Sequence, residues 1–76
     1  MGNGFPLTDQ QWDELDKLRF STASAGVYRN CLIILMTSQR WTIPASAKFV
    51  GCGIDTIKRI RRQYRQHGIA GLIPGH

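Results

Sequence analysis

The sequence has few of the features that catalytic proteins need. Its 76 residues include only five acidic side chains and two cysteines, and the cysteines do not form a C-x-x-C pair. A chain of this length forms one domain with a single small core, which leaves little room for a catalytic cleft. We therefore expect a single domain over residues 1–76 that carries no catalytic residues of its own, no metal site and no cofactor.

Long hydrophobic runs are also missing. The apolar run at residues 31–36 is six residues long, far below the roughly 18 that cross a bilayer. Two cysteines do not make a disulfide framework, and the chain opens without the pattern of a signal peptide. These absences predict a cytoplasmic protein with no membrane partner.

Apolar residues and basic charge are plentiful. Hydrophobic residues make up 42% of the chain, too much for a disordered tail, and the net charge is +5. Residues 1–20 hold four acids against two bases, whereas residues 21–76 hold eight bases against Asp55 alone. Five of those eight bases lie between Lys58 and Arg65. This asymmetry favours a polyanionic partner, although a basic run is by default a solvated face.

Two helices are expected in the first half of the chain. Thr8 and Gln11 have the spacing of a capping box, which predicts a helix from about Asp9 to Phe20. A second helix, over about residues 23–38, is apolar nearly all round and belongs at the centre of the core. Its inward stripe at helical spacing is Tyr28, Cys31, Leu32 and Leu35. Cys31 is interpreted as a small buried hydrophobe rather than a reactive thiol.

Two more helices are expected in the second half. Thr42 caps a short helix with Pro44 in its first turn, and the glycines of residues 51–53 end it. The last helix runs from about Ile54 to His67, with Gly68 as a left-handed C-terminal cap. The core is expected to span residues 7–68, with 69–76 as a tail or the start of a linker.

These two helices carry the spacing of a helix-turn-helix unit. Such a unit has a small residue where its helices cross and a glycine four positions later, which are Ala47 and Gly51 in this chain. It also has branched apolar residues six and nine positions after the glycine, which are Ile57 and Ile60. An ordinary helical hairpin would need the glycine but not a basic outer face. The sequence therefore predicts an all-α, four-helix, homeodomain-like bundle with a helix-turn-helix.

The outer face of the last helix is the candidate DNA-reading surface. With Ile57, Ile60 and Tyr64 inward, the opposite side carries polar and basic residues. The candidates for base contact are Ile54, Asp55, Lys58 and Arg59, and those for phosphate contact are Arg40, Lys48, Arg62 and Arg65. Three roles are open to Asp55, namely accepting from cytosine, orienting an arginine, or favouring the helix N-terminus.

From Leu7 to Leu72 the chain resembles the N-terminal DNA-binding region of mariner-like bacterial insertion-sequence transposases. The matching pieces are Leu7-Thr8, Arg29 ahead of Ile33-Ile34-Leu35, Trp41-Thr42, Gly51, Thr56-Ile57-Lys58-Arg59, Tyr64, and His67-Gly68-Ile69-Ala70-Gly71-Leu72. Two positions depart from the family pattern: Gly53 stands where a capping side chain is usual, and Ile60 where an aromatic, often tryptophan, is usual.

The resemblance implies binding to the terminal inverted repeats of a mobile element. It also implies that DNA cutting and joining belong to an RNase-H-like domain that would follow the present C-terminus. The expected partner is double-stranded DNA at the nucleoid, with a possible homodimer when the domain is part of a longer chain. The alternatives are a transcriptional regulator that uses the same motif and a module whose basic helix docks on an acidic protein.

Overall fold

The chain is built from helices over residues 7–74, which are the residues that the computed structural model describes. No strand occurs in this part of the chain, so the all-α fold class is confirmed. Residues 1–6 and 75–76, which the single-domain prediction includes, lie outside the described residues. The elements are α1 (Asp9–Ser21), α2 (Ala25–Ser38), α3 (Ile43–Val50), α4 (Ile54–His67) and the short 3-10 helix η1 (Gly68–Leu72).

Helix α1 begins at the predicted capping box. The Thr8 hydroxyl oxygen accepts from the Gln11 N–H at 3.1 Å, and the Gln11 side-chain oxygen accepts from the Thr8 N–H at 2.9 Å. Two of the N–H groups that a helix start leaves unpaired are thereby satisfied. The helix buries Leu15 completely and packs along α2. Of its acidic side chains, Asp9 and Asp13 are exposed, whereas Glu14 and Asp16 are half-buried.

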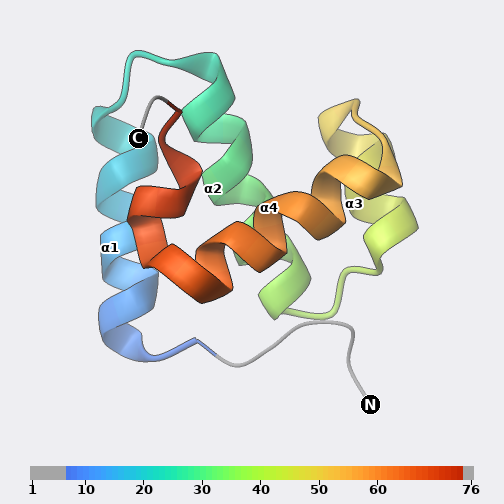
Figure 1. Cartoon of the computed structure of the whole chain (residues 1–76). Coiled ribbons are helices and arrows are strands. Elements are labelled where there is room, and N and C mark those ends of the chain that lie inside the picture. Colours follow the sequence, from blue (N-terminus) through green and yellow to red (C-terminus); the bar gives the residue numbers. More distant parts are fainter. Residues whose placement is uncertain (1–6, 75–76) are drawn as a thin grey trace.

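Helix α2 is the central element, as its composition predicted. It contacts α1, α3, α4 and η1, and α4 crosses in front of it (Figure 1). Every side chain from Ile33 to Thr37 is buried, because this half of the helix is covered from several sides. The one hydroxyl among them, on Thr37, donates to the Ile33 carbonyl at 2.7 Å, so its burial leaves no unpaired donor.

The predicted inward stripe of α2 is correct at Cys31 and Leu35 but wrong at its first member. Tyr28 is 40% exposed, and Leu32 is only half-buried. Outside the predicted stripe, the helix also buries Val27 and Asn30 in its first half and Ile33, Ile34, Met36 and Thr37 in its second, and it begins at Ala25 after the N-cap Ser24. At the edge of α2 the Tyr28 hydroxyl lies near the Arg19 guanidinium of α1, a polar partner that a position inside the apolar core would not offer.

The segment after α4 folds back onto the core. Leu72 is 1% exposed, and its carbonyl accepts from the Asn30 side-chain amide at 2.9 Å. Gly71 lies so close to α4 that a Cβ there would meet the carbonyl carbon of Gln63 at 2.8 Å. Gly68 has the expected positive φ of 65°, but its ψ of −148° is not that of a left-handed helical cap. The core therefore continues beyond residue 68 as far as Leu72.

Candidate nucleic-acid interface

Helices α3 and α4 form the predicted helix-turn-helix. Thr42 caps α3 by accepting from the Ala45 N–H at 3.1 Å, and α3 ends at Gly51, whose φ of 79° and ψ of 37° are left-handed. The Ala47 carbonyl accepts from the N–H groups of both Gly51 and Cys52. Since a side chain at a positive φ is strained, a glycine suits this turn. Ala47, Ile57 and Ile60 are all buried, so the four signature positions do what their spacing predicted.

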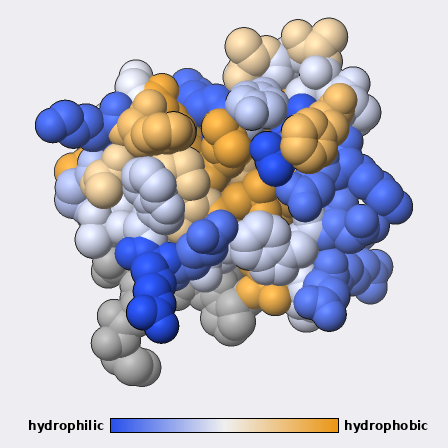
Figure 2. Space-filling view, turned by 180° about the vertical axis from the view of Figure 1, so that it is seen from behind, coloured by the Kyte–Doolittle hydropathy of each residue, from blue (hydrophilic) through white to orange (hydrophobic). Residues whose placement is uncertain are grey.

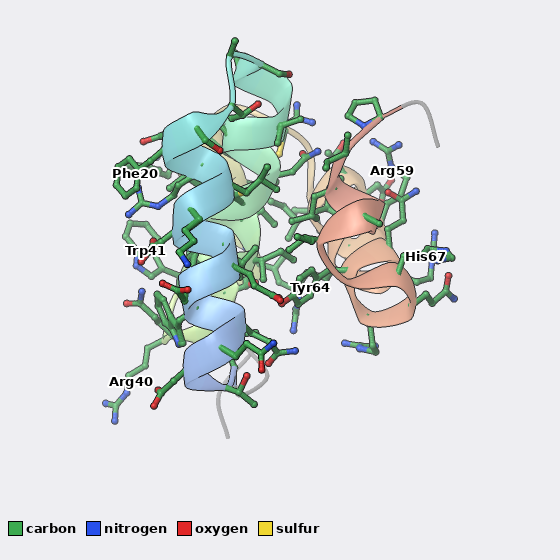
Figure 3. All side chains as sticks on the ribbon, turned by 90° about the vertical axis from the view of Figure 1, so that its left-hand side faces the viewer. Phe20, Arg40, Trp41, Arg59, Tyr64 and His67 are labelled. Atoms are coloured by element: carbon green, nitrogen blue, oxygen red, sulfur yellow. The ribbon has the colours of Figure 1, made fainter. Side chains whose placement is uncertain are left out.

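Helix α4 divides into a buried side and an exposed side. Ile57, Ile60 and Tyr64 are at most 4% exposed. In Figure 3, Tyr64 lies between α4 and α1, whereas Arg59 and His67 project from the opposite side of α4. The exposed residues on this outer face of α4 are Asp55, Lys58, Arg59, Arg62 and Gln66. The four candidates for base contact are therefore all accessible, with Ile54 at 43% exposure.

The start of α4 lacks a side-chain cap. Gly53 occupies the N-cap position with an extended backbone, and it has no side chain to accept from the first N–H groups. Asp55 lies in the first turn, where its charge is favourable beside the positive end of the helix. Consequently the first turn of α4 keeps exposed backbone donors next to the candidate base-contacting residues.

The phosphate-contact candidates do not all lie together. Arg62 and Arg65 are exposed on α4, and Lys48 is exposed on α3. Arg40 projects on the opposite side of the domain from Arg59, the side on which Trp41 also lies (Figure 3). The structure therefore does not bring Arg40 to the outer face of α4, and a straight duplex lying on that face would not reach it.

Basic charge is in excess on the outer face of α4, where Lys58, Arg59 and Arg62 stand with the single acid Asp55. Within residues 7–74, Lys58, Arg59 and Arg62 form no ion pair, and the ion pairs Lys17–Asp13 and Arg19–Asp16 both belong to α1. Burial and the nearby Arg65 lower the pKa of Arg61, which lies at the edge of the buried side. An excess of cations on a helix face attracts a polyanion.

Sequence reasoning missed a polar groove beside α4. It has a volume of about 780 Å³ and lies between α4, α2 and the η1 segment. Arg29, the only charged residue of α2, lines it together with Arg59 and Arg62. Arg29, a single cation on an otherwise apolar helix, was the one sequence feature that pointed to this site. The groove itself forms only because η1 folds back.

The face of the domain opposite the outer face of α4 carries both apolar and polar side chains. Figure 2 shows apolar and polar patches side by side there. The exposed aromatic side chains include Phe20, Trp41 and Phe49. Phe49 packs edge-on against Trp41, with 5.4 Å between the ring centroids. The Arg19 guanidinium lies 4.1 Å from the ring centroid of Phe20. In Figure 3, Phe20 and Trp41 both lie on this side, away from Arg59.

Other chemistry finds no site among the described residues. The Cys31 thiol is fully buried, and this burial raises its pKa to about 11, so it is a core side chain. No group of three or more His, Cys, Asp or Glu side chains in residues 7–74 is placed to hold a metal ion. None of the helices in that range is long and apolar enough to cross a membrane.

Comparison with known proteins places this geometry in a family. A family model described as a homeodomain-like domain matches residues 24–73, which is more than half of the chain and includes α2, α3, α4 and η1. No curated protein and no solved structure gave a match. The chain therefore belongs to the homeodomain-like domain family, whose helix-turn-helix unit points to DNA binding.

Proposed function

We propose that the domain binds double-stranded DNA by inserting α4 into the major groove. The observation that carries the proposal is the outer face of α4, where cations without ion pairs stand opposite the buried Ile57, Ile60 and Tyr64. The major groove, about 12 Å wide, admits an α-helix, and in helix-turn-helix proteins the first turns of the second helix meet the base edges.

Each exposed residue near the start of α4 has a chemically defined role in this arrangement. Lys58 and Arg59 donate to the acceptor edge of guanine, and Ile54 offers an apolar contact to the methyl group of thymine. Asp55 can accept from cytosine, orient a neighbouring arginine, or favour the helix N-terminus, and these three roles stay open. Arg62 and Arg65 lie farther along the helix, with Lys48 on α3, and supply phosphate contacts that fix the orientation without reading sequence.

The biological setting of this binding is transposition. The resemblance of residues 7–72 to the DNA-binding region of mariner-like insertion-sequence transposases supports recognition of terminal inverted repeats. In that setting the domain works at the bacterial nucleoid, as a dimer when it is part of a longer chain. Strand cleavage would then be carried out by a catalytic domain elsewhere in the transposase.

The deciding experiment is a selection from random duplexes, followed by affinity measurements on the selected sequence. The Lys58→Ala, Arg59→Ala double variant should lose about 10- to 100-fold in affinity, since one good base contact contributes about 1–3 kcal/mol of discrimination. It should fold like the parent, because both side chains are exposed. Lys17→Ala removes an exposed cation from α1 and should bind like the parent.

Three results would contradict the proposal in different ways. A double variant that binds the selected duplex as tightly as the parent would remove α4 from the interface. Binding that does not weaken with added salt would favour a protein-interaction module, because release of counterions from DNA makes binding salt-dependent. A selected sequence with no copy at the ends of a mobile element would leave DNA binding in place and would favour a transcriptional regulator.

A further inference from the structure

The groove beside α4 has the composition of an anion site. Among residues 7–74, its polar lining consists of guanidinium, amide and imidazole groups, with no carboxylate side chain. The side chains that matter are Arg29 from α2 and Arg59, Arg62, Gln63, Gln66 and His67 from α4. Like charges gathered at one groove repel one another unless an anion lies between them, so this composition favours a negatively charged ligand.

Arg29 is held in place at this groove. One of its terminal nitrogens donates to the Asn30 side-chain oxygen at 3.1 Å, and the Asn30 amide nitrogen donates to the Leu72 carbonyl at 2.9 Å. Asn30 is 6% exposed; its bond to the Leu72 carbonyl is buried, and the bond that it accepts from Arg29 is partly buried. The guanidinium is therefore oriented before any ligand arrives, which reduces the entropy lost on binding.

The protein satisfies only part of the hydrogen-bonding capacity of Arg29. A guanidinium has five donors, and with partners among residues 7–74 the Arg29 guanidinium makes one bond, to Asn30. The Nε of Arg29 is buried and has no hydrogen-bond partner. Within residues 7–74, neither Arg29, Arg59 nor Arg62 forms an ion pair. Arg29 and Arg62 in one groove suit a tetrahedral phosphate, whose oxygens accept from several arginines together, and the charge of Arg59 beside them adds to the attraction.

We infer that this groove binds a phosphate group, with Arg29 as its principal ligand, and that the phosphate belongs to the backbone of the duplex read by α4. The assignment of this phosphate to DNA rests on the proposed function, whereas the phosphate site itself does not. Arg59 and Arg62 belong both to the outer face of α4 and to the groove. Because a phosphate backbone borders the major groove on each side, a duplex on the outer face brings one strand past the mouth of this groove.

The first test is the salt dependence of DNA binding by Arg29→Gln. Losing one phosphate contact should reduce the slope of log affinity against log salt by about 0.9 and weaken binding at low salt. Preference for the selected duplex over a random one should stay as in the parent, because phosphates carry no sequence information. Arg29→Lys keeps the charge and should restore the slope, while Lys17→Gln is the matched control on α1. An Arg29→Gln variant with parental affinity and slope would overturn the inference.

The second test locates the phosphate. Replacing backbone phosphates one at a time by neutral methylphosphonates should reveal a position that weakens the parent but has no further effect on Arg29→Gln. Additive losses at every position would overturn the inference. If the glutamine variant does not fold, Arg29→Lys is compared instead: because the lysine contact is weaker but present, the loss at that one position should be smaller than in the parent.

A third test separates the groove from the reading of DNA. Inorganic phosphate and pyrophosphate are titrated into the parent while the Arg29 side-chain N–H signal is followed by NMR. If phosphate shifts the Arg29 signal but the protein binds no duplex, the groove is still a phosphate site. The proposed function, and with it the assignment of the phosphate to DNA, would then be contradicted. Duplex binding with no Arg29 contact in either DNA test would overturn the site and leave the proposed function standing.

Discussion

Replacing Gly53 by serine tests how α4 begins. Gly53 is the N-cap of α4, with φ of −81° and ψ of 161°, a conformation that any residue adopts. A Cβ at this position would meet no atom within 4 Å. A serine hydroxyl there accepts from a first-turn N–H that no side chain now caps. We therefore expect Gly53→Ser to stabilise the domain.

The expected gain is about 0.3 kcal/mol in the free energy of unfolding, because serine is a better N-cap than glycine by a few tenths of a kcal/mol. This difference already includes glycine's greater freedom in the unfolded chain. For a domain of this size that corresponds to a rise in Tm of about 1–3 °C. Alanine is a poorer N-cap than glycine, because it adds a Cβ without a hydroxyl, so Gly53→Ala should be less stable than the parent.

Two positions earlier, the same substitution should have the opposite effect. Gly51 has a φ of 79°, where a side chain costs about 1–2 kcal/mol, so Gly51→Ser should lower the Tm. Thermal unfolding followed by circular dichroism, with urea unfolding at one temperature, measures all three variants. A Gly53→Ser protein less stable than Gly53→Ala would refute the capping argument, and a Gly53→Ser protein less stable than the parent would refute the extended conformation.

Three further predictions concern the core. Ile57→Ala removes a fully buried side chain and should cost about 2–5 kcal/mol in urea unfolding; a loss under about 1 kcal/mol would show that this side chain does not seat α4. Gly71→Ala places a Cβ against the backbone of Gln63, so η1 should lift and expose Leu72, a loss of about 1.5–3 kcal/mol that parental stability would contradict. Burial raises the pKa of Cys31 to about 11 from 9.0, so the folded state holds this proton more tightly and stability should fall as the pH rises from about 9 toward 11. Cys31→Ala should lack that component, and parallel pH profiles for the two proteins would contradict the assignment.

The sequence predicted best the features that depend on neighbouring residues. The capping box of Thr8 and Gln11 fixes the start of α1, and the left-handed Gly51 fixes the turn before α4. The buried side of α4 was also predicted correctly, because Ile57 and Ile60 recur at helical spacing on a helix whose other side is strongly polar. Strong local signals of this kind require no knowledge of the rest of the fold.

The errors arose where distant segments meet. Asn30 is polar and was not expected inside, yet it is buried because the Leu72 carbonyl, 42 residues later, needs a donor there. Helix α2 has apolar residues on nearly every side, so its composition could not show that Tyr28 lies at the edge. The groove at Arg29 depends on the same return of η1, which explains why that arginine was not among the predicted site residues.

The separation of charge between α1 and α4 affects the rate at which the domain associates with a polyanion. Four acids lie on α1, and the outer face of α4 carries cations on the side that faces away from α1 (Figure 3). In the field of a polyanion such a molecule experiences a torque that turns α4 forward and α1 away before contact is made. Fewer collisions are then wasted on the wrong face, so the arrangement raises the association rate, and added salt shortens the range over which the rotation begins.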